Sequence, residues 1–231
     1  MTVIYFIRHG ESEVNITKEF SYKLVDKPLT AKGRLQAQQA GEYFSNISID
    51  ALFSSPLIRA QETAHFISTL HSHSVSLPVR VLEQFREINV GDLEKSPPTN
   101  ITWDRFFETW HSWDAGDYGA SFPNGENYHQ LLARMQEGLR IILEDPKITT
   151  AIIVGHGGIF MKTLPAILTN LTFADLEILP WLNACITVTS IKLENNLPCG
   201  ELQEYGLVSH LHGEAAIQIS GTPNTDRLPP K

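Results

Sequence analysis

Two apolar segments far apart in the chain each run directly into a histidine that is followed by glycine. Residues 3–7 (Val-Ile-Tyr-Phe-Ile) are followed by Arg8 and His9, and residues 151–154 (Ala-Ile-Ile-Val) are followed by a glycine and His156. Short apolar runs bounded by glycine are typical of buried strands in a parallel sheet. Ligands of such sheets bind outside the carboxyl ends of the strands, where glycine lets them approach the backbone. The pattern therefore predicts one binding site for an anion, phosphate above all, that both histidines and the arginine face.

The composition fits one globular domain. The chain has 231 residues, 42% of them hydrophobic, and no linker or repeat divides it before about residue 195. It lacks the roughly 18 consecutive apolar residues of a membrane span and the basic-then-apolar start of a secretory signal. Cys185 and Cys199 have no metal-type spacing. We expect a cytoplasmic protein, because unpatterned cysteines fit a reducing compartment, although one disulfide between them stays an open alternative.

The charge balance limits the class of partner. The formal net charge is −8 at pH 7, which argues against nucleic acid and anionic membranes as partners. A phosphate site needs only a local cluster of donors, so the global charge is compatible with a phosphorylated small molecule. We expect such a substrate as the partner, with no nucleic acid and no membrane, and the sequence leaves monomer and homodimer open.

Strands and helices alternate along most of the chain. Further strands are expected at residues 50–53, 79–82 and 184–193. Helices are expected after the N-cap Thr30, with Pro56 in a first turn, from Gly125, and from Gly158 to about Leu168. This alternation predicts one domain, 1–231, with a doubly wound, mostly parallel α/β sheet flanked by helices. Residues from about 220 to 231 are expected to be a frayed tail.

An aromatic-rich segment interrupts this alternation at about residues 92–125. Aromatic residues recur there at helical spacing, at Trp103, Phe106, Phe107, Trp110 and Trp113. Such a stripe is typical of an amphipathic helix that packs onto the domain. An alternative, compatible with the first for different side chains, is that the aromatics shape a substrate pocket. We expect a helical cap insertion over the active site.

Four short motifs follow one another in a fixed order. They are Arg8-His9-Gly10-Glu11 with Asn15, Ser54-Ser55-Pro56-Leu57 with Arg59, Arg86-Glu87-Ile88 with Gly91, and Val154-Gly155-His156-Gly157. Each is weak alone, but together they resemble the histidine phosphatase superfamily, also called phosphoglycerate-mutase-like, from residue 3 to about 190. The resemblance implies phosphoryl transfer through a phosphohistidine, with His9 as the phosphorylated residue.

The residue types in these motifs suit that chemistry on physical grounds as well. A neutral imidazole such as that of His9 is a competent nucleophile for phosphorus. The planar guanidinium groups of Arg8 and Arg59 suit phosphate oxygens, and these cations should keep the pKa of His9 low. His156 and the backbone N–H groups that follow Gly157 are expected to donate further hydrogen bonds to the phosphate. Asn15 is either an additional donor or a structural residue.

Glu87 is the candidate general acid for the leaving oxygen and then the general base for water. The resemblance favours it over three nearby carboxylates, Glu83, Asp92 and Glu94, while Glu126 is expected to pair or cap near a helix start. No metal or other cofactor is expected, because the two arginines supply the charge that Mg²⁺ supplies elsewhere. A metal site built from His9, His156 and Glu87 is the competing chemistry, but the arginines would repel a cation.

The nature of the reaction has alternatives. Residues 96–125 contain one basic residue, Arg105, against four acidic ones, which disfavours a mutase that must hold two phosphate groups. We therefore expect the phosphatase branch and hydrolysis of a small phosphorylated metabolite. Phosphoglycerate-mutase-type transfer is the first alternative, and a non-catalytic, phosphate-binding regulatory module is the alternative of another class.

Two segments depart from the family pattern. Residues 20–24 (Phe-Ser-Tyr-Lys-Leu) stand where the family has Arg-x-Gln-Gly, and residues 91–96 lack its Trp-Glu-Gly. Both segments lie where substrate would be selected. The departures therefore bear on the identity of the substrate rather than on the phosphohistidine step.

Overall fold

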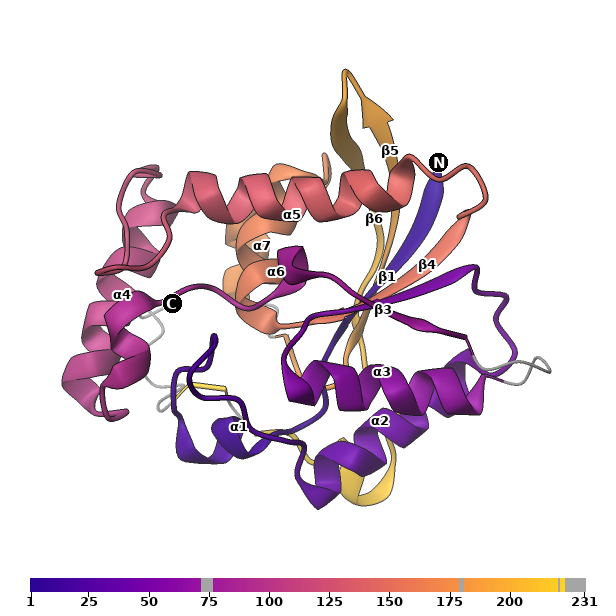
Figure 1. Ribbon diagram of the computed structural model, residues 1–231, viewed down its shortest axis with the longest axis horizontal. Coiled ribbons are helices and arrows are strands. Elements are labelled where there is room, and N and C mark those ends of the chain that lie inside the picture. The colour runs from indigo at the N-terminus through magenta and orange to yellow at the C-terminus, as the bar shows by residue number, and fades with distance from the viewer. Residues whose placement is uncertain (72–76, 179–180, 220, 223–231) are drawn as a thin grey trace.

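A six-stranded sheet lies at the centre of the computed structural model, which describes residues 1–71, 77–178, 181–219 and 221–222 (Figure 1). The strand order is β3-β2-β4-β1-β5-β6. The strands are β1 (Thr2–Arg8), β2 (Ala51–Ser54), β3 (Val79–Val81), β4 (Thr150–Gly155), β5 (Ile186–Glu194) and β6 (Leu197–Leu207). Strands β1 to β4 are parallel to one another, β5 is antiparallel to β1, and β6 is antiparallel to β5. The predicted mostly parallel sheet is confirmed.

Helices cover both faces of this sheet (Figure 1). The α-helices of the described residues are α1 (Glu13–Thr17), α2 (Ala31–Phe44), α3 (Ile58–Leu70), α4 (Asn100–Asp114), α5 (Tyr128–Leu143), α6 (Gly157–Thr163) and α7 (Phe173–Ile178). Phe6 belongs to a buried cluster with residues of α4, α5 and α6. Its neighbour Ile7 points to the other face and packs with residues of α2 and α3. No helix in the described ranges is long and apolar enough to cross a membrane.

Strand β6 was not expected from the sequence. Pro198, Gly200 and Gly206 interrupt its 11 residues, and such residues weaken a strand signal. The informative signal is the preceding pair Asn195-Asn196, in which both residues have positive φ. Two such residues form the tight turn that joins antiparallel strands in a hairpin.

Helix boundaries agree with the sequence at α2 and differ at α3. Thr30 caps α2 as expected, with its hydroxyl accepting from the Gly33 N–H at 3.0 Å. Helix α3 begins at Ile58, so Pro56 precedes the helix instead of occupying its first turn. The Asp26 carboxylate accepts from the Ile58 N–H at 2.9 Å. A distant carboxylate thus caps this helix, which a local reading of the sequence does not show.

The aromatic stripe lies on helix α4, beside α1 and away from the centre of the sheet (Figure 1). Trp103 is buried, its ring lies tilted against that of Phe20 with the centroids 4.4 Å apart, and its indole N–H donates to the Lys18 carbonyl at 3.2 Å. The stripe thus packs onto the loop that follows α1 through Trp103 and against Tyr128 of α5 through Trp113, and its contact with substrate stays a prediction. The predicted frayed tail lies outside the described residues except for positions 221 and 222.

Candidate active site

His9 and His156, which follow strands β1 and β4, lie side by side. Strands β1 and β4 are adjacent, with Arg8 opposite Gly155, and the His9 N–H donates to the Gly155 carbonyl at 3.0 Å. The ring centroids of His9 and His156 are 5.2 Å apart. Both side chains are buried. The structure thus brings together two residues 147 positions apart, as the parallel-strand argument predicts.

The hydrogen bonds of His9 define its tautomer. Its Nδ1 lies 2.6 Å from the Gly10 carbonyl oxygen, which only accepts. Its Nε2 lies 3.0 Å from Nε of Arg59, which only donates. Nδ1 therefore carries the proton and Nε2 carries a lone pair. Burial, reinforced by Arg59 and Arg8, lowers the pKa of His9 well below its usual value, so the ring is neutral at physiological pH.

Arg59 sits on the first turn of α3 and is almost fully buried. Besides the bond to His9, its Nη1 donates to the Ser21 hydroxyl at 2.7 Å. Burial lowers the pKa of Arg59 to about 10, an effect that the Glu87 and Asp26 carboxylates oppose. The guanidinium group therefore stays charged at neutral pH, next to Nε2 of His9.

Arg8 approaches the site from the end of β1. Its Nη1 donates to the Trp181 carbonyl, and its Nε is buried without a hydrogen-bond partner among the described residues. A Cβ built on Gly157 would lie 3.6 Å from this Nε. The Nε–H group is thus a buried donor at the start of α6, available to an acceptor that enters the site.

His156 presents a second buried polar atom that has no partner among the described residues. Its Nε2 lies 2.7 Å from the Ser55 hydroxyl, which also accepts from the Leu57 N–H at 3.3 Å. A hydroxyl can donate one hydrogen bond and accept two, so Nε2 either accepts from Ser55 or donates to it, and this contact allows both tautomers of His156. The buried atom without a partner is Nδ1. Burial, together with Arg59, lowers the pKa of His156 well below its usual value.

Glu87 is bound to the same junction. Its carboxylate accepts from the N–H groups of Gly158 at 3.0 Å, Ile159 at 2.8 Å and Ile88 at 2.9 Å. The expectation that the amides beyond Gly157 face phosphate is therefore wrong for Gly158 and Ile159. The carboxylate of Glu87 takes them, because the start of a helix offers unpaired N–H groups to an anion.

The other nearby carboxylates have separate partners. Glu83 forms an ion pair with Arg86, and Asp92 forms one with Lys95. Glu94 accepts through one oxygen from four consecutive N–H groups, those of Tyr22, Lys23, Leu24 and Val25. Of these acids, Glu87 is the one that contacts the His156 junction.

The two departures from the family pattern thus form one unit. The Glu94 carboxylate, from one departing segment, accepts from the backbone N–H groups of residues 22–25, which overlap the other segment, residues 20–24. The adjacent Ser21 binds Arg59. The shape of this loop is therefore linked to the position of the buried arginine beside His9.

Asn15 is largely committed to local structure. Its Oδ1 accepts from the Ser12 N–H at 3.0 Å and completes a capping box at the start of α1. The same oxygen accepts from Nδ2 of Asn183 at 3.2 Å. Asn183 also donates to the His9 carbonyl at 3.2 Å and is fully buried. No motif marks Asn183 in the sequence, because its role depends on a loop that returns to the site from the far end of the chain.

The competing metal site does not assemble. The described residues contain no group of three or more His, Cys, Asp and Glu side chains arranged to hold an ion. Both ring nitrogens of His9 have other partners, and one partner is the charged Arg59.

The neutral buried histidines predict a pH-dependent stability. In the unfolded chain each histidine binds a proton below about pH 6.5, whereas His9 and His156 stay neutral in the fold. The unfolded state then binds more protons, so the free energy of unfolding is expected to fall as the pH drops below 6.5. The expected slope is up to about 1.4 kcal/mol per pH unit for each histidine.

Urea unfolding at pH 7.5, 6.5 and 5.5 measures this slope. His9→Asn should reduce it by the share of one histidine. An unchanged slope in the variant would show that His9 is not held neutral by the fold.

Comparison with known proteins agrees with this geometry. The family model of the histidine phosphatase superfamily (branch 1) matches residues 4–197. A Bacillus subtilis (strain 168) protein named "Uncharacterized phosphatase PhoE" is 30% identical over 216 residues, covering 92% of this chain and 98% of the relative. A Salmonella choleraesuis (strain SC-B67) protein named "Probable phosphoglycerate mutase GpmB" is 32% identical over 158 residues, covering 68% of this chain and 70% of the relative.

Solved structures share the fold as well. Bacillus stearothermophilus YhfR has a TM-score of 0.71 at 25% identity, covering 91% of this chain and 99% of that one. His9, Arg59, Glu87 and His156 all lie within the matched range, residues 4–197. The chain therefore belongs to the histidine phosphatase superfamily and is an enzyme of the histidine phosphatase type.

Proposed function

We propose that this enzyme hydrolyses phosphomonoesters of small metabolites through a phosphohistidine on His9, without a metal ion. The observation that carries the proposal is the His9 tautomer. Its Nδ1 lies against the Gly10 carbonyl, and its neutral Nε2 lies 3.0 Å from the charged Arg59. A lone pair held beside a cation is suited to attack an electrophile that carries negative charge.

In the first step, Nε2 of His9 forms a bond to phosphorus and the bond from phosphorus to the ester oxygen breaks. A proton on Glu87 passes to the leaving oxygen as that bond breaks. Arg8 and Arg59 neutralise charge on the phosphoryl oxygens. In the second step, water attacks phosphorus, Glu87 accepts its proton, and the bond to Nε2 breaks to release phosphate.

Three further donors complete the proposed phosphate cradle. They are Nδ1 of His156, in the tautomer that carries its proton there, the N–H of Gly157 and the Nδ2 group of Asn15. Nδ1 of His156 is buried without a partner among the described residues, and in that tautomer its N–H group carries a desolvation penalty unless an acceptor reaches it. A phosphoryl oxygen between His9 and His156 would serve as that acceptor.

Mutase activity is the second candidate, because several relatives are named probable phosphoglycerate mutases. The two reactions share the first step and differ in whether water or a second substrate takes the phosphoryl group. The acidic composition of residues 96–125 supports hydrolysis, since a mutase must hold a second phosphate.

An assay with an aryl phosphate in the presence of a chelator tests the proposal. We expect steady hydrolysis that the chelator leaves unchanged. Turnover that requires added metal would support the competing metal site instead. Absence of turnover, with equal phosphate binding by wild type and His9→Asn, would support a non-catalytic phosphate-binding module.

A further inference from the structure

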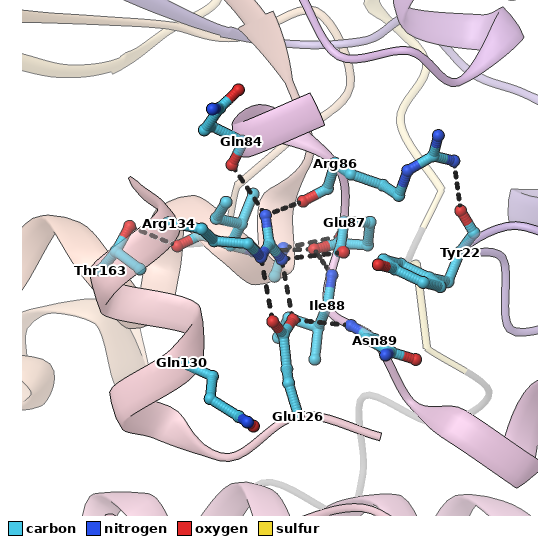
Figure 2. A network of polar contacts seen from close by, with 12 residues as sticks. Tyr22, Gln84, Arg86, Glu87, Ile88, Asn89, Glu126, Gln130, Arg134 and Thr163 are labelled. Atoms are coloured by element: carbon cyan, nitrogen blue, oxygen red, sulfur yellow. Dashed lines mark hydrogen bonds and ion pairs between the residues drawn. The ribbon is translucent and has the colours of Figure 1, made fainter. Parts of the chain in front are cut away.

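Arg134 lies on helix α5. All five N–H groups of its guanidinium donate, three to backbone carbonyls of residues 84–87 and two to the Glu126 carboxylate. Nη1 donates to the carbonyls of Gln84 at 2.8 Å and Arg86 at 2.6 Å, and Nη2 donates to the carbonyl of Glu87 at 3.0 Å. Nε and Nη2 also donate to the Glu126 carboxylate, at 2.9 and 2.8 Å. Figure 2 shows the Arg134 guanidinium between helix α5 and the segment that carries Glu87.

Glu126 binds the same segment from its other side. Its Oε1 accepts from the Asn89 N–H at 2.7 Å in addition to the bond from Arg134. Glu126 is buried, and Arg134 is largely so. Arg134 and Glu126 therefore hold backbone groups both before and after position 87, and Figure 2 shows Glu87 between Arg86 and Asn89.

The carboxylate of Glu87 lies on the amides of α6, two and three residues after His156. Its place thus depends on two anchors, the start of α6 for the side chain and the Arg134–Glu126 pair for the backbone. Proton transfer needs donor and acceptor atoms about 2.6–3.2 Å apart. A misplacement of about 1 Å can cost about 100-fold in rate.

We propose that Arg134 and Glu126 are positioning residues that hold Glu87 in place for proton transfer to the leaving oxygen. This inference rests on the proposed function, in which Glu87 is the general acid. Arg134 does not touch the reacting atoms; it acts through the backbone of Glu87. Replacing Arg134 should therefore slow most the hydrolysis of esters whose leaving oxygen needs a proton from Glu87.

Leaving-group selectivity separates positioning from a merely structural role. An alkyl phosphate needs a proton on its leaving oxygen, whereas a nitrophenyl phosphate leaves well without one. Arg134→Lys keeps a charge but lacks the planar fork. We expect it to lower kcat/KM for the alkyl ester by about 10- to 100-fold and for the nitrophenyl ester by no more than about twofold.

A double-mutant cycle with Glu87→Gln makes the test specific. Once the acid is absent, adding Arg134→Lys should change kcat/KM for the alkyl ester by no more than about twofold, because the effects of residues that act as a unit are not additive. Arg140→Lys is the matched control: Arg140 is on the same helix and pairs with Glu137 and Glu144 at the surface. We expect no selective loss in that variant.

Glu126→Gln provides a second variant if Arg134→Lys does not fold. It retains an acceptor for the Asn89 N–H and removes the charge, and we expect the same selectivity. Equal losses for both esters, or full additivity with Glu87→Gln, would overturn the positioning role. If wild type hydrolyses neither ester, the proposed function fails. If Glu87→Gln is selective and neither the Arg134 nor the Glu126 variant is, only the positioning inference fails.

Discussion

Replacing His9 with asparagine is expected to lower kcat by at least about 10⁴-fold, since removal of a nucleophile eliminates the covalent route. The asparagine amide can still donate to the Gly10 carbonyl, which accepts from Nδ1 of His9 in the wild type. It has no lone pair that can replace Nε2. The variant should therefore bind inorganic phosphate through the arginines while it fails to turn over.

His65→Asn is the matched control for this experiment. His65 lies on α3 with an exposed side chain, so the same substitution there should leave kcat within about twofold. Steady-state assays with a nitrophenyl phosphate, together with thermal unfolding of both variants, measure the effect. A His9→Asn enzyme that is folded and retains a tenth of wild-type activity would exclude His9 as the nucleophile.

Glu87→Gln is expected to lower kcat/KM for an alkyl phosphate by about 10²- to 10⁴-fold, the usual contribution of a general acid. The nitrophenyl ester should lose far less in kcat/KM, because this ratio reports the first step and nitrophenolate leaves without a proton. For the nitrophenyl ester, kcat should fall by a larger factor than kcat/KM, because Glu87 also activates water in the second step. Rapid mixing should then show a burst of about one nitrophenolate per active site.

Glu83→Gln controls for the loss of a nearby charge. Glu83 is exposed and forms an ion pair with Arg86. Its replacement should therefore change kcat/KM for either ester by no more than about twofold. Equal losses of kcat/KM for both esters in Glu87→Gln would assign proton transfer to another group.

The sequence predicts the parts of this site that strands and helix starts carry. His9 and His156 follow apolar runs, and the ends of adjacent parallel strands must meet at one edge of the sheet. Arg59 follows in the first turn of a helix whose apolar spacing is regular. Local pattern is enough in these cases because regular structure fixes the direction of each side chain.

The rest of the site depends on contacts between distant segments. Glu94 binds residues 22–25, Asn183 reaches the His9 carbonyl, and Arg134 binds carbonyls about 50 positions away. Backbone carbonyl and N–H groups carry no side-chain signal in a sequence, so nothing marks which residue will bind them. The sequence did indicate that Glu126 pairs near a helix start, and its partner is Arg134.

The central claim is that the phosphoryl group passes through His9, and the most direct measurement is the phosphoenzyme itself. Wild type is mixed with a phosphate ester, stopped within milliseconds, and analysed by mass spectrometry under conditions that preserve phosphoramidates. We predict an acid-labile phosphate on His9, at up to about one per chain, because a covalent intermediate splits the reaction into two steps. Rapid hydrolysis with no phosphate on His9, or with phosphate on another residue, would contradict this mechanism.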